Sequence, residues 1–259
     1  MLRRWCIPLA GLALAGGPLA ASAPAAAASY PARPTIHLIR PAMHGTAPMA
    51  VRGQPANAIG SQNWSGYAAH GKTYTKISAN WVEPTGHCTS SGTFSSFWVG
   101  LDGFTSRTVE QTGSEVDCSA GRARYFAWFE MYPAPPVSFS DPVHPGDHFT
   151  GSVTFTGGGH YTLVLKDTTQ GWSQSVDKTR NGAKNSSAEV IAEAPLAGSI
   201  LPLTNFGTVH FSNAAVNGAA MGNAKPAKII MVNGSGRAKD SVSALSGGTA
   251  FSVKWLHST

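Results

Sequence analysis

The chain has 259 residues, of which 42% are hydrophobic and 12% charged, and it contains 29 glycines and 17 prolines. This length can form one large β domain or two small ones, and the composition favours an all-β secreted protein over a helical one. The formal charge of +6 lies almost wholly in residues 1–60, which hold five arginines and no acidic residue. Residues 61–259 hold 14 basic and 13 acidic residues, a balance of 14 − 13 = +1, so the charge gives no support to nucleic-acid binding.

The first 28 residues have the pattern of a secretory signal peptide. Two arginines precede an apolar run over residues 5–15, and small residues follow up to Ala28. The run is short and is interrupted at residues 16–18 by two glycines and a proline, which disfavours a membrane anchor. We therefore expect residues 1–28 to be removed, and the protein to be secreted (extracellular) with no membrane partner.

Residues 29–60 form a second segment, rich in Pro, Ala, Arg and His and without strand alternation or helical period. We interpret it as a propeptide or a disordered arm. Its arginines could pair with carboxylates of a functional site at neutral pH, and protonation of those carboxylates would weaken the contact. The alternative is a leader that any protease could trim.

From residue 61 to residue 259, short segments of alternating hydrophobicity are separated by Gly-rich or Asn-Gly turns. In the stretch RYFAWFEMY (124–132) both alternating faces are bulky, which predicts a central strand covered on both sides. No stretch predicts a helix of three turns. About a dozen strands in one unit predict an all-β fold, an antiparallel two-sheet β-sandwich of the concanavalin-like or jelly-roll-like type, with a substrate cleft on one curved sheet.

Two cysteines remain after the signal segment, Cys88 and Cys118. In an oxidising compartment a disulfide between them is the simplest interpretation, and closing such a loop stabilises a fold by about 3 kcal/mol. No histidine or second cysteine stands at ligand spacing from either residue, so we expect no metal site.

The motifs of serine, cysteine and zinc hydrolases are missing, which leaves carboxylates as candidate catalysts. In AEVIAEAP, Glu189 and Glu193 share one face and Val190 lies on the other, so the acidic face either lines a site or meets solvent. Gln111 shares a face with Gly113, which indicates close approach of a ligand or, equally simply, a buried amide that satisfies backbone groups. Four aspartates in turn sequences are expected to be solvated, namely Asp141, Asp147, Asp177 and Asp240.

Five motifs, NWSGY, FWVGLDG, VEQTG, YFAWFEMYP and SSAEVIAEAP, stand in the order found in one known family. Over about residues 63–217 the chain resembles the glutamic peptidases, or eqolisins. The resemblance implies a secreted endopeptidase that is active in acid, with a sandwich of two large antiparallel sheets and neither metal nor cofactor. It implies a catalytic dyad of Gln111 and Glu189, and supporting or substrate-binding roles for Asp102, Glu130, Trp98 and Trp128.

One position departs from the family pattern, because Val190 stands where the family usually has Trp. A period of two puts Val190 on the face opposite Glu189, so we expect the change to affect packing more than chemistry. In this interpretation the expected partners are protein or peptide substrates, and the protein is expected to be a monomer.

The proposed dyad can carry out peptide hydrolysis, because a carboxylate can take a proton from water and a carboxamide can donate to an oxyanion. A glutamate ordinarily titrates near about 4.3, which predicts activity in acid. Two other functions stay open. A β-sandwich glycoside hydrolase would pair Glu130 with Glu189, and a lectin-like binding module would stack tryptophans on sugars without an essential carboxylate.

Overall fold

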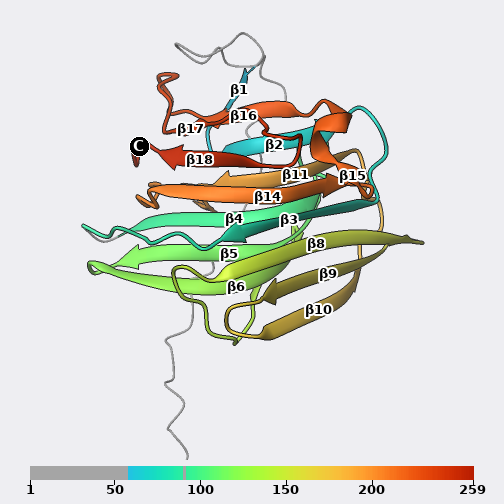
Figure 1. The fold of residues 1–259 in the computed structure, drawn as a ribbon, viewed down its shortest axis with the longest axis horizontal. Coiled ribbons are helices and arrows are strands. Elements are labelled where there is room, and N and C mark those ends of the chain that lie inside the picture. Colours follow the sequence, from blue (N-terminus) through green and yellow to red (C-terminus); the bar gives the residue numbers. More distant parts are fainter. Residues whose placement is uncertain (1–57, 90–91) are drawn as a thin grey trace, which may run out of the picture. The chain divides into compact units, whose positions relative to one another are not determined.

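The computed structural model of the chain describes residues 58–89 and 92–259, and in these residues almost every element is a β-strand (Figure 1). The predicted signal peptide (1–28) and nearly all of the predicted propeptide or arm (29–60) lie outside the described residues. The single helix in the described part of the chain is a four-residue 3-10 helix, η1 (Met221–Ala224). No helix in this part is long and apolar enough to cross a membrane.

Two eight-stranded sheets make up the fold, and all their strand pairs are antiparallel except the parallel pair β1–β16. The first sheet has the order β1 (Ala58–Ser61), β16 (Ala227–Met231), β2 (Trp64–His70), β11 (Ser187–Glu193), β4 (Thr93–Leu101), β5 (Val109–Ser119), β6 (Arg122–Tyr132) and β7 (Val137–Ser138). The second has the order β10 (Trp172–Thr179), β9 (His160–Asp167), β8 (His148–Gly157), β3 (Lys76–Val82), β14 (Thr208–Val216), β18 (Phe251–Trp255) and β17 (Asp240–Val242), with β15 (Ala219–Ala220) paired to β14. A small hairpin, β12 (Leu196–Ala197) with β13 (Ser199–Ile200), stands apart.

The predicted two-sheet antiparallel β-sandwich is therefore confirmed. Figure 1 shows the strands of both sheets running in nearly the same direction across the view, as in sandwiches of the aligned type. The strands outnumber the predicted dozen because several have only two residues. The first strand begins at Ala58, three residues before the predicted start of the sandwich domain.

The main core lies between the two sheets and is built from residues that alternate inward. Ile77 and Trp81 of β3 and Phe149 of β8 meet Val99 of β4 and Phe129 of β6 in one buried cluster. The Trp81 ring stacks on Phe149 with 5.5 Å between centroids. This arrangement follows from the period of two, which sends every second side chain of each strand to the same face.

Strand β6 confirms the prediction of a strand covered on both faces. Ala127, Phe129 and Met131 belong to the core between the sheets, whereas Trp128 and Tyr132 belong to a second buried cluster. Because neighbouring residues of a strand point to opposite faces, the second cluster lies on the face of the first sheet that is turned away from the second sheet. Its other members are Trp64, Ala68, Trp98, Phe104, Val109, Ile191 and Ile229.

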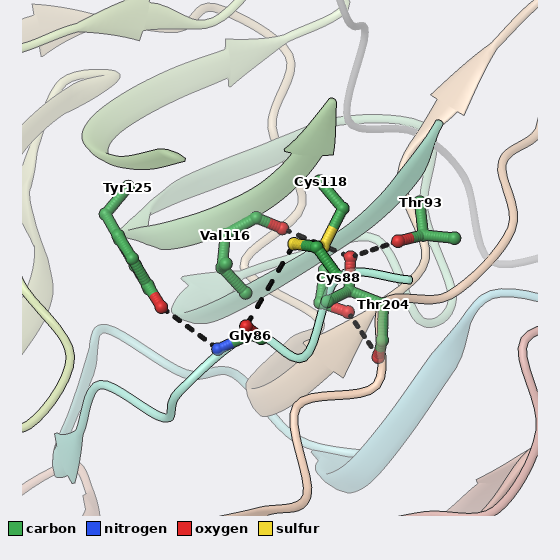
Figure 2. The surroundings of a disulfide bond; sticks show 8 residues. Gly86, Cys88, Thr93, Val116, Cys118, Tyr125 and Thr204 are labelled. Carbon is green, nitrogen blue, oxygen red and sulfur yellow. Dashed lines mark hydrogen bonds between the residues drawn. A yellow bond between two sulfur atoms is a disulfide. The ribbon is translucent and has the colours of Figure 1, made fainter. Parts of the chain in front are cut away.

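The predicted disulfide is present, and it joins Cys88 in the segment after β3 to Cys118 in β5 (Figure 2). The two Cα atoms are 5.4 Å apart. The same segment is held by a second contact, in which the backbone N–H of Gly86 donates to the Tyr125 hydroxyl at 3.0 Å. The disulfide therefore fastens the connection between the two sheets to the strands of the first sheet.

A chain of buried polar groups runs through the core near this connection. The Trp81 indole N–H donates to Ser114 Oγ at 2.7 Å, and the Ser114 hydroxyl donates to Glu83 Oε2. Burial raises the pKa of Glu83 to about 8, with smaller contributions from nearby acidic groups, while the Ser114 hydrogen bond acts in the opposite direction. Glu83 is therefore a neutral acid in the folded protein at acidic pH.

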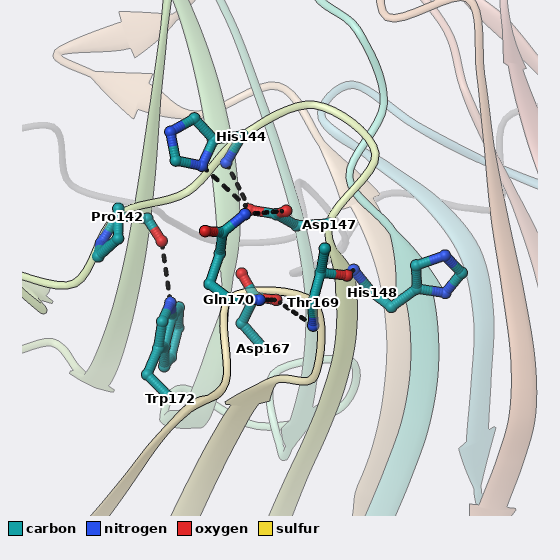
Figure 3. A network of polar contacts seen from close by, with 8 residues as sticks. All are labelled: Pro142, His144, Asp147, His148, Asp167, Thr169, Gln170 and Trp172. Atoms are coloured by element: carbon teal, nitrogen blue, oxygen red, sulfur yellow. Dashed lines mark hydrogen bonds and ion pairs between the residues drawn. The ribbon is translucent and has the colours of Figure 1, made fainter.

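The prediction that four aspartates in turns are solvated is wrong for two of them. Asp147 and Asp240 are buried; Asp147 lies directly before β8, and Asp240 is the first residue of β17 and is paired with Trp255 of β18. In Figure 3, Asp147 accepts hydrogen bonds from the His144 backbone N–H at 2.6 Å and from Gln170 Nε2 at 2.8 Å. The neighbouring Asp167 accepts from the backbone N–H groups of two residues of its own turn, and burial raises its pKa. Asp177 is exposed, as predicted.

Candidate active site

The register of four neighbouring strands brings the two predicted catalytic residues into one row across the first sheet. Glu189 of β11 is paired with Gly100 of β4, Gly100 with Gln111 of β5, and Gln111 with Glu130 of β6. Residues directly opposite each other in a sheet send their side chains to the same face. Glu189, Gln111 and Glu130 therefore share one face, and the position between Glu189 and Gln111 carries no side chain.

This face is the one turned away from the second sheet. Val190 and Val99, which flank Glu189 and Gly100 in sequence, belong to the core between the sheets. Trp98 and Ile191, in the next row of the dyad face, belong to the second cluster. The predicted location of Val190 is thus confirmed, and the residue that replaces the family's Trp packs into the core.

Gly100 places no side chain between Glu189 and Gln111 in this row. Adjacent strands are about 4.8 Å apart, so the Cα atoms of Glu189 and Gln111 are separated by about 10 Å. A Cβ atom at Gly100 would lie 3.1 Å from Gln111 Cβ and 2.9 Å from Trp98 Cζ3. The edge of the Trp98 indole and the Gln111 side chain therefore leave no room for a side chain at residue 100.

Gln111 is held in place by Glu130. Its Nε2 donates to Glu130 Oε2 at 2.6 Å, and Gln111 is only 2% exposed. Because a carboxamide nitrogen carries two N–H groups, this bond leaves a second donor on the same nitrogen. Glu130 thereby orients the carboxamide; its supporting role stays a prediction.

Glu189 is fully buried, and neither of its carboxyl oxygens has a hydrogen bond of normal geometry within residues 58–89 and 92–259. Burial raises the pKa of Glu189 well above its usual value, and the charges of Asp102 and Glu110 act in the same direction. The Ser187 hydroxyl and the Phe104 backbone N–H offset part of this effect. The sequence predicted an ordinary glutamate at this position, whereas the structure gives it the character of a stronger base.

Asp102 fixes the segment that leads into β11. Its carboxylate accepts hydrogen bonds from the backbone N–H groups of Lys184, Asn185 and Ser186 at 2.8, 2.7 and 2.9 Å, and from the Ser186 hydroxyl at 3.0 Å. Its own N–H donates to the Ser187 carbonyl at 2.9 Å. Asp102 also has a left-handed backbone with φ of 68°, which directs its side chain to this segment. Asp102 therefore holds the backbone segment that directly precedes Ser187 and Glu189.

The two predicted aromatic residues lie in the row beside the dyad. Trp98 is paired with Ile191 on one side and Gly113 on the other, and Gly113 is paired with Trp128. The Trp98 indole N–H donates to Glu193 Oε2 at 2.8 Å, and its ring meets Trp64 edge-on at 4.9 Å. Both predicted tryptophans are thus buried on the dyad face.

Sequence reasoning missed several residues of this site, most clearly Gly100 and Asn63. Asn63 Nδ2 donates to Glu193 Oε1 at 3.0 Å, so two donors hold a carboxyl whose pKa burial raises to about 8. The NWSGY and FWVGLDG motifs contain both residues, but only the strand register shows what they adjoin. The described residues contain no group of three or more His, Cys, Asp or Glu side chains placed to hold a metal ion.

Comparison with known proteins identifies relatives of this chain. The model of the Peptidase A4 family matches residues 62–255. Aspergillopepsin-2 from Aspergillus niger is 31% identical over 181 residues, which span 60% of this chain and 64% of that protein. The chain thus covers less than two thirds of that curated relative.

Solved structures show the same fold. The crystal structure of scytalido-glutamic peptidase with a transition-state analogue inhibitor matches with a TM-score of 0.67 and 24% identity, over 75% of this chain and 98% of that one. Aspergilloglutamic peptidase from Aspergillus niger matches with a TM-score of 0.55 and 26% identity, over 63% of this chain and 99% of that one.

Proposed function

The chain belongs to the Peptidase A4 family, the eqolisin glutamic peptidases, and from this premise we propose that it is an endopeptidase in which Glu189 and Gln111 form the catalytic dyad. The substrate class is protein or peptide, in keeping with the transition-state analogue bound by scytalido-glutamic peptidase. The observation that carries the proposal is the row Glu189–Gly100–Gln111–Glu130, in which an acid and an amide flank a position without a side chain.

In the proposed reaction, the Glu189 carboxylate removes a proton from a water molecule as the water oxygen attacks the carbonyl carbon of the substrate. The N–H of Gln111 that Glu130 does not hold donates to the oxygen as it gains negative charge. Glu189, now protonated, gives the proton to the nitrogen of the leaving amine, and the C–N bond breaks. The products are a carboxylic acid and an amine, and Glu189 returns to its starting state.

The surroundings of the dyad suit these steps. Burial in an apolar cluster makes the Glu189 carboxylate a stronger base, although it also lowers the ionised fraction in acid. A buried donor that is already oriented is worth more than one in water, because it does not reorganise during the reaction. The Gln111–Glu130 hydrogen bond supplies that orientation. In the peptidase proposal this hydrogen bond gives Gln111 a catalytic role. A glycosidase that paired Glu130 with Glu189 would leave Gln111 without a role.

Residues 1–28 act, in this proposal, as a signal peptide that directs the protein outside the cell, and residues 29–60 as a segment removed on maturation. The Cys88–Cys118 disulfide supports an oxidising compartment. Sequencing the amino terminus of the active protein recovered from culture medium tests both points. A mature protein that still begins within residues 1–28 would contradict them.

Cleavage of a protein substrate at acidic pH tests the activity itself. Glu189→Gln should fold but lose cleavage, and Gln111→Ala should lose about 10²–10³ in rate, the typical cost of one oxyanion donor. Glu110→Gln is the matched control, because Glu110 is equally buried but faces the core, and burial raises its pKa to about 8, so it is already neutral in acid. Activity should also survive serine and cysteine inhibitors and a chelator. Wild-type turnover by Glu189→Gln would end the assignment.

A further inference from the structure

The Glu189 carboxyl group lacks a hydrogen bond of normal geometry, although the proposed reaction requires this group to ionise. Glu189 is fully buried, and within residues 58–89 and 92–259 neither of its carboxyl oxygens accepts such a bond. An ionised carboxylate that is buried without a donor is costly, because it has lost its water without a replacement. A base that must release its proton in acid therefore needs a donor close by.

Ser187 stands two residues before Glu189 in β11, so the two side chains point to the same face of the sheet. Ser187 is also fully buried. Its Oγ accepts a hydrogen bond from the Phe104 backbone N–H at 3.3 Å, and its carbonyl accepts one from the Asp102 N–H at 2.9 Å. Because a hydroxyl carries one donor in addition to its lone pairs, the bond from Phe104 leaves the Ser187 hydrogen free to donate.

The Phe104 N–H also indicates that the Ser187 hydroxyl and the Glu189 carboxyl lie close together. This N–H donates to Ser187 Oγ. Burial raises the pKa of Glu189, and the Ser187 hydroxyl and the same Phe104 N–H both act against that rise. A hydrogen-bond donor lowers the pKa of a carboxyl only when it lies within reach of the ionised form. The Ser187 hydroxyl is therefore placed to donate to Glu189 once that carboxyl ionises.

The acidic groups near Glu189 oppose its ionisation or are held by other donors. The charges of Asp102 and Glu110 add to burial in raising the pKa of Glu189. The Asp102 carboxylate accepts from the segment before β11, and Glu110 faces the core between the sheets. Glu130, in the same row of the sheet as Glu189, accepts from Gln111 Nε2 at 2.6 Å.

Two further titratable side chains lie near this end of β11. Burial and, to a smaller extent, the charge of Glu189 raise the pKa of Tyr74, but the Tyr74 hydroxyl already donates to the His70 carbonyl at 2.8 Å. His70 is paired with Ser187, yet its side chain is exposed and its ring centroid lies 5.0 Å from that of Phe104. Among these groups, Ser187 alone combines burial on the dyad face with a hydrogen that is free to donate.

We propose that Ser187 is a positioning residue, whose hydroxyl donates to the ionised Glu189 carboxylate while its oxygen accepts from the Phe104 backbone N–H. This chain of donors keeps the base ionised at a lower pH than burial alone allows, and it fixes the direction of the carboxylate. Hydrogen bonds in such a series strengthen one another. The catalytic consequence rests on the proposed peptidase function, whereas the hydrogen bond itself does not.

The pH profile of cleavage separates this role from a merely structural one. The acid limb of kcat/KM reports the pKa of the base in the free enzyme. Ser187→Ala should move that limb upward by about one pH unit, an effect typical of one hydrogen bond to a charged group, so kcat/KM below the limb should fall about tenfold with a smaller change on the plateau. Ser187→Thr keeps the hydroxyl and should bring the limb back toward the wild-type position. An unmoved limb in Ser187→Ala, or a fall in the same proportion at every pH, refutes the positioning role.

Ser95→Ala is the matched control. Ser95 is an equally buried serine of β4, and its hydroxyl donates to the Thr204 carbonyl at 3.3 Å. It is paired with Val116, whose side chain belongs to the core between the sheets and not to the dyad face. This variant should lower the Tm about as much as Ser187→Ala and leave the acid limb unmoved. A limb that moves equally in both variants would contradict the proposal.

NMR titration of isotope-labelled glutamate side chains tests the hydrogen bond without any need for activity. The Glu189 signal is identified by its loss in Glu189→Gln, and its midpoint should lie about one pH unit higher in Ser187→Ala than in the wild type. Equal midpoints overturn the proposal even when the wild type cleaves peptides. A shifted midpoint in a protein that does not cleave supports the hydrogen bond and refutes the peptidase function.

Neutron diffraction from crystals of the wild type needs no variant. Above the midpoint of Glu189, the hydrogen of the Ser187 hydroxyl should point at a Glu189 carboxyl oxygen. A hydrogen that points at a different acceptor would overturn the proposal.

Discussion

Gly100 offers the sharpest test of the proposed dyad, since even a single methyl group there would press on Trp98 and Gln111. In Gly100→Ala the new Cβ would lie 2.9 Å from Trp98 Cζ3, 3.1 Å from Gln111 Cβ and 3.3 Å from the Glu110 carbonyl oxygen. Ordinary contacts begin at about 3.4 Å, so the neighbours must move by up to about half an ångström each. The backbone at Gly100 lies outside the left-handed region, so alanine meets only this crowding.

The expected loss of activity exceeds what instability can explain. Overpacking of this kind typically costs about 1–3 kcal/mol, whereas domains are stable by about 5–15 kcal/mol, so Gly100→Ala should stay folded at 25 °C. A displacement of about 1 Å in a catalytic group can cost about 10²-fold. We therefore expect kcat/KM on a peptide substrate at acidic pH to fall by about 10- to 100-fold, because the added methyl group displaces Gln111 and Trp98 beside Glu189.

Gly151→Ala provides the matched control. Its Cβ would lie 2.9 Å from two atoms of Trp81 and 3.0 Å from Val99 Cγ2, which is similar crowding, but in the core between the sheets. It should lower the Tm about as much as Gly100→Ala and leave kcat/KM near the wild-type value below the unfolding transition. The reasoning is refuted if Gly100→Ala keeps wild-type kcat/KM, or if both variants lose the same activity.

Three further predictions concern the neighbours of the dyad, the core and the leader. Asp102→Asn should lower both Tm and kcat with a smaller change in KM, because the hydrogen bonds that Asp102 accepts hold the segment before Glu189. Hydrogen bonds to a charged group stabilise by about 1.5–3 kcal/mol each. An unchanged kcat would contradict the positioning role of Asp102. Because burial raises the pKa of Glu83 to about 8, its stabilising contribution is complete below about 4.5 and is lost as pH rises through about 8. The Tm of Glu83→Gln should therefore fall less between pH 4 and pH 8 than that of the wild type, and equal falls would contradict this. A synthetic 29–60 peptide added to the mature protein should inhibit cleavage at mildly acidic pH, and the absence of inhibition would leave that segment as a leader only.

Period-two alternation accounts for most of what could be predicted from the sequence. It predicted that Glu189 and Val190 lie on opposite faces of β11. It also predicted that both faces of β6 are covered by other residues. The structure confirms both predictions. Period-two alternation succeeds because the face to which a side chain points depends only on its position along its own strand. The disulfide could also be predicted from the sequence, since two cysteines allow only one pairing.

What escaped prediction depends on contacts between distant segments. Nothing in FWVGLDG indicates that Gly100 stands between Glu189 and Gln111, because this follows from the register of three strands. Asp147 and Asp240 carry turn signals, yet both are buried, since the fold brings distant residues, Gln170 and Ser65, to them. The raised pKa of Glu189 also comes from the packing around it and not from its own sequence.

The buried acids set the pH range of the fold and that of the proposed chemistry in different ways. Glu83, Glu110 and Glu193 are buried, and burial raises the pKa of each to about 8, so the folded state favours them as neutral acids. In the proposed mechanism Glu189, unlike these three acids, must release its proton to act as a base, and Gln111 does not titrate. As pH rises, loss of the proton from Glu189 favours the active form of the proposed dyad, whereas loss of protons from the three other buried acids destabilises the folded state. We therefore expect unfolding of the sandwich, and not titration of the proposed dyad, to set the upper pH limit of activity, so loss of activity and loss of structure should coincide there.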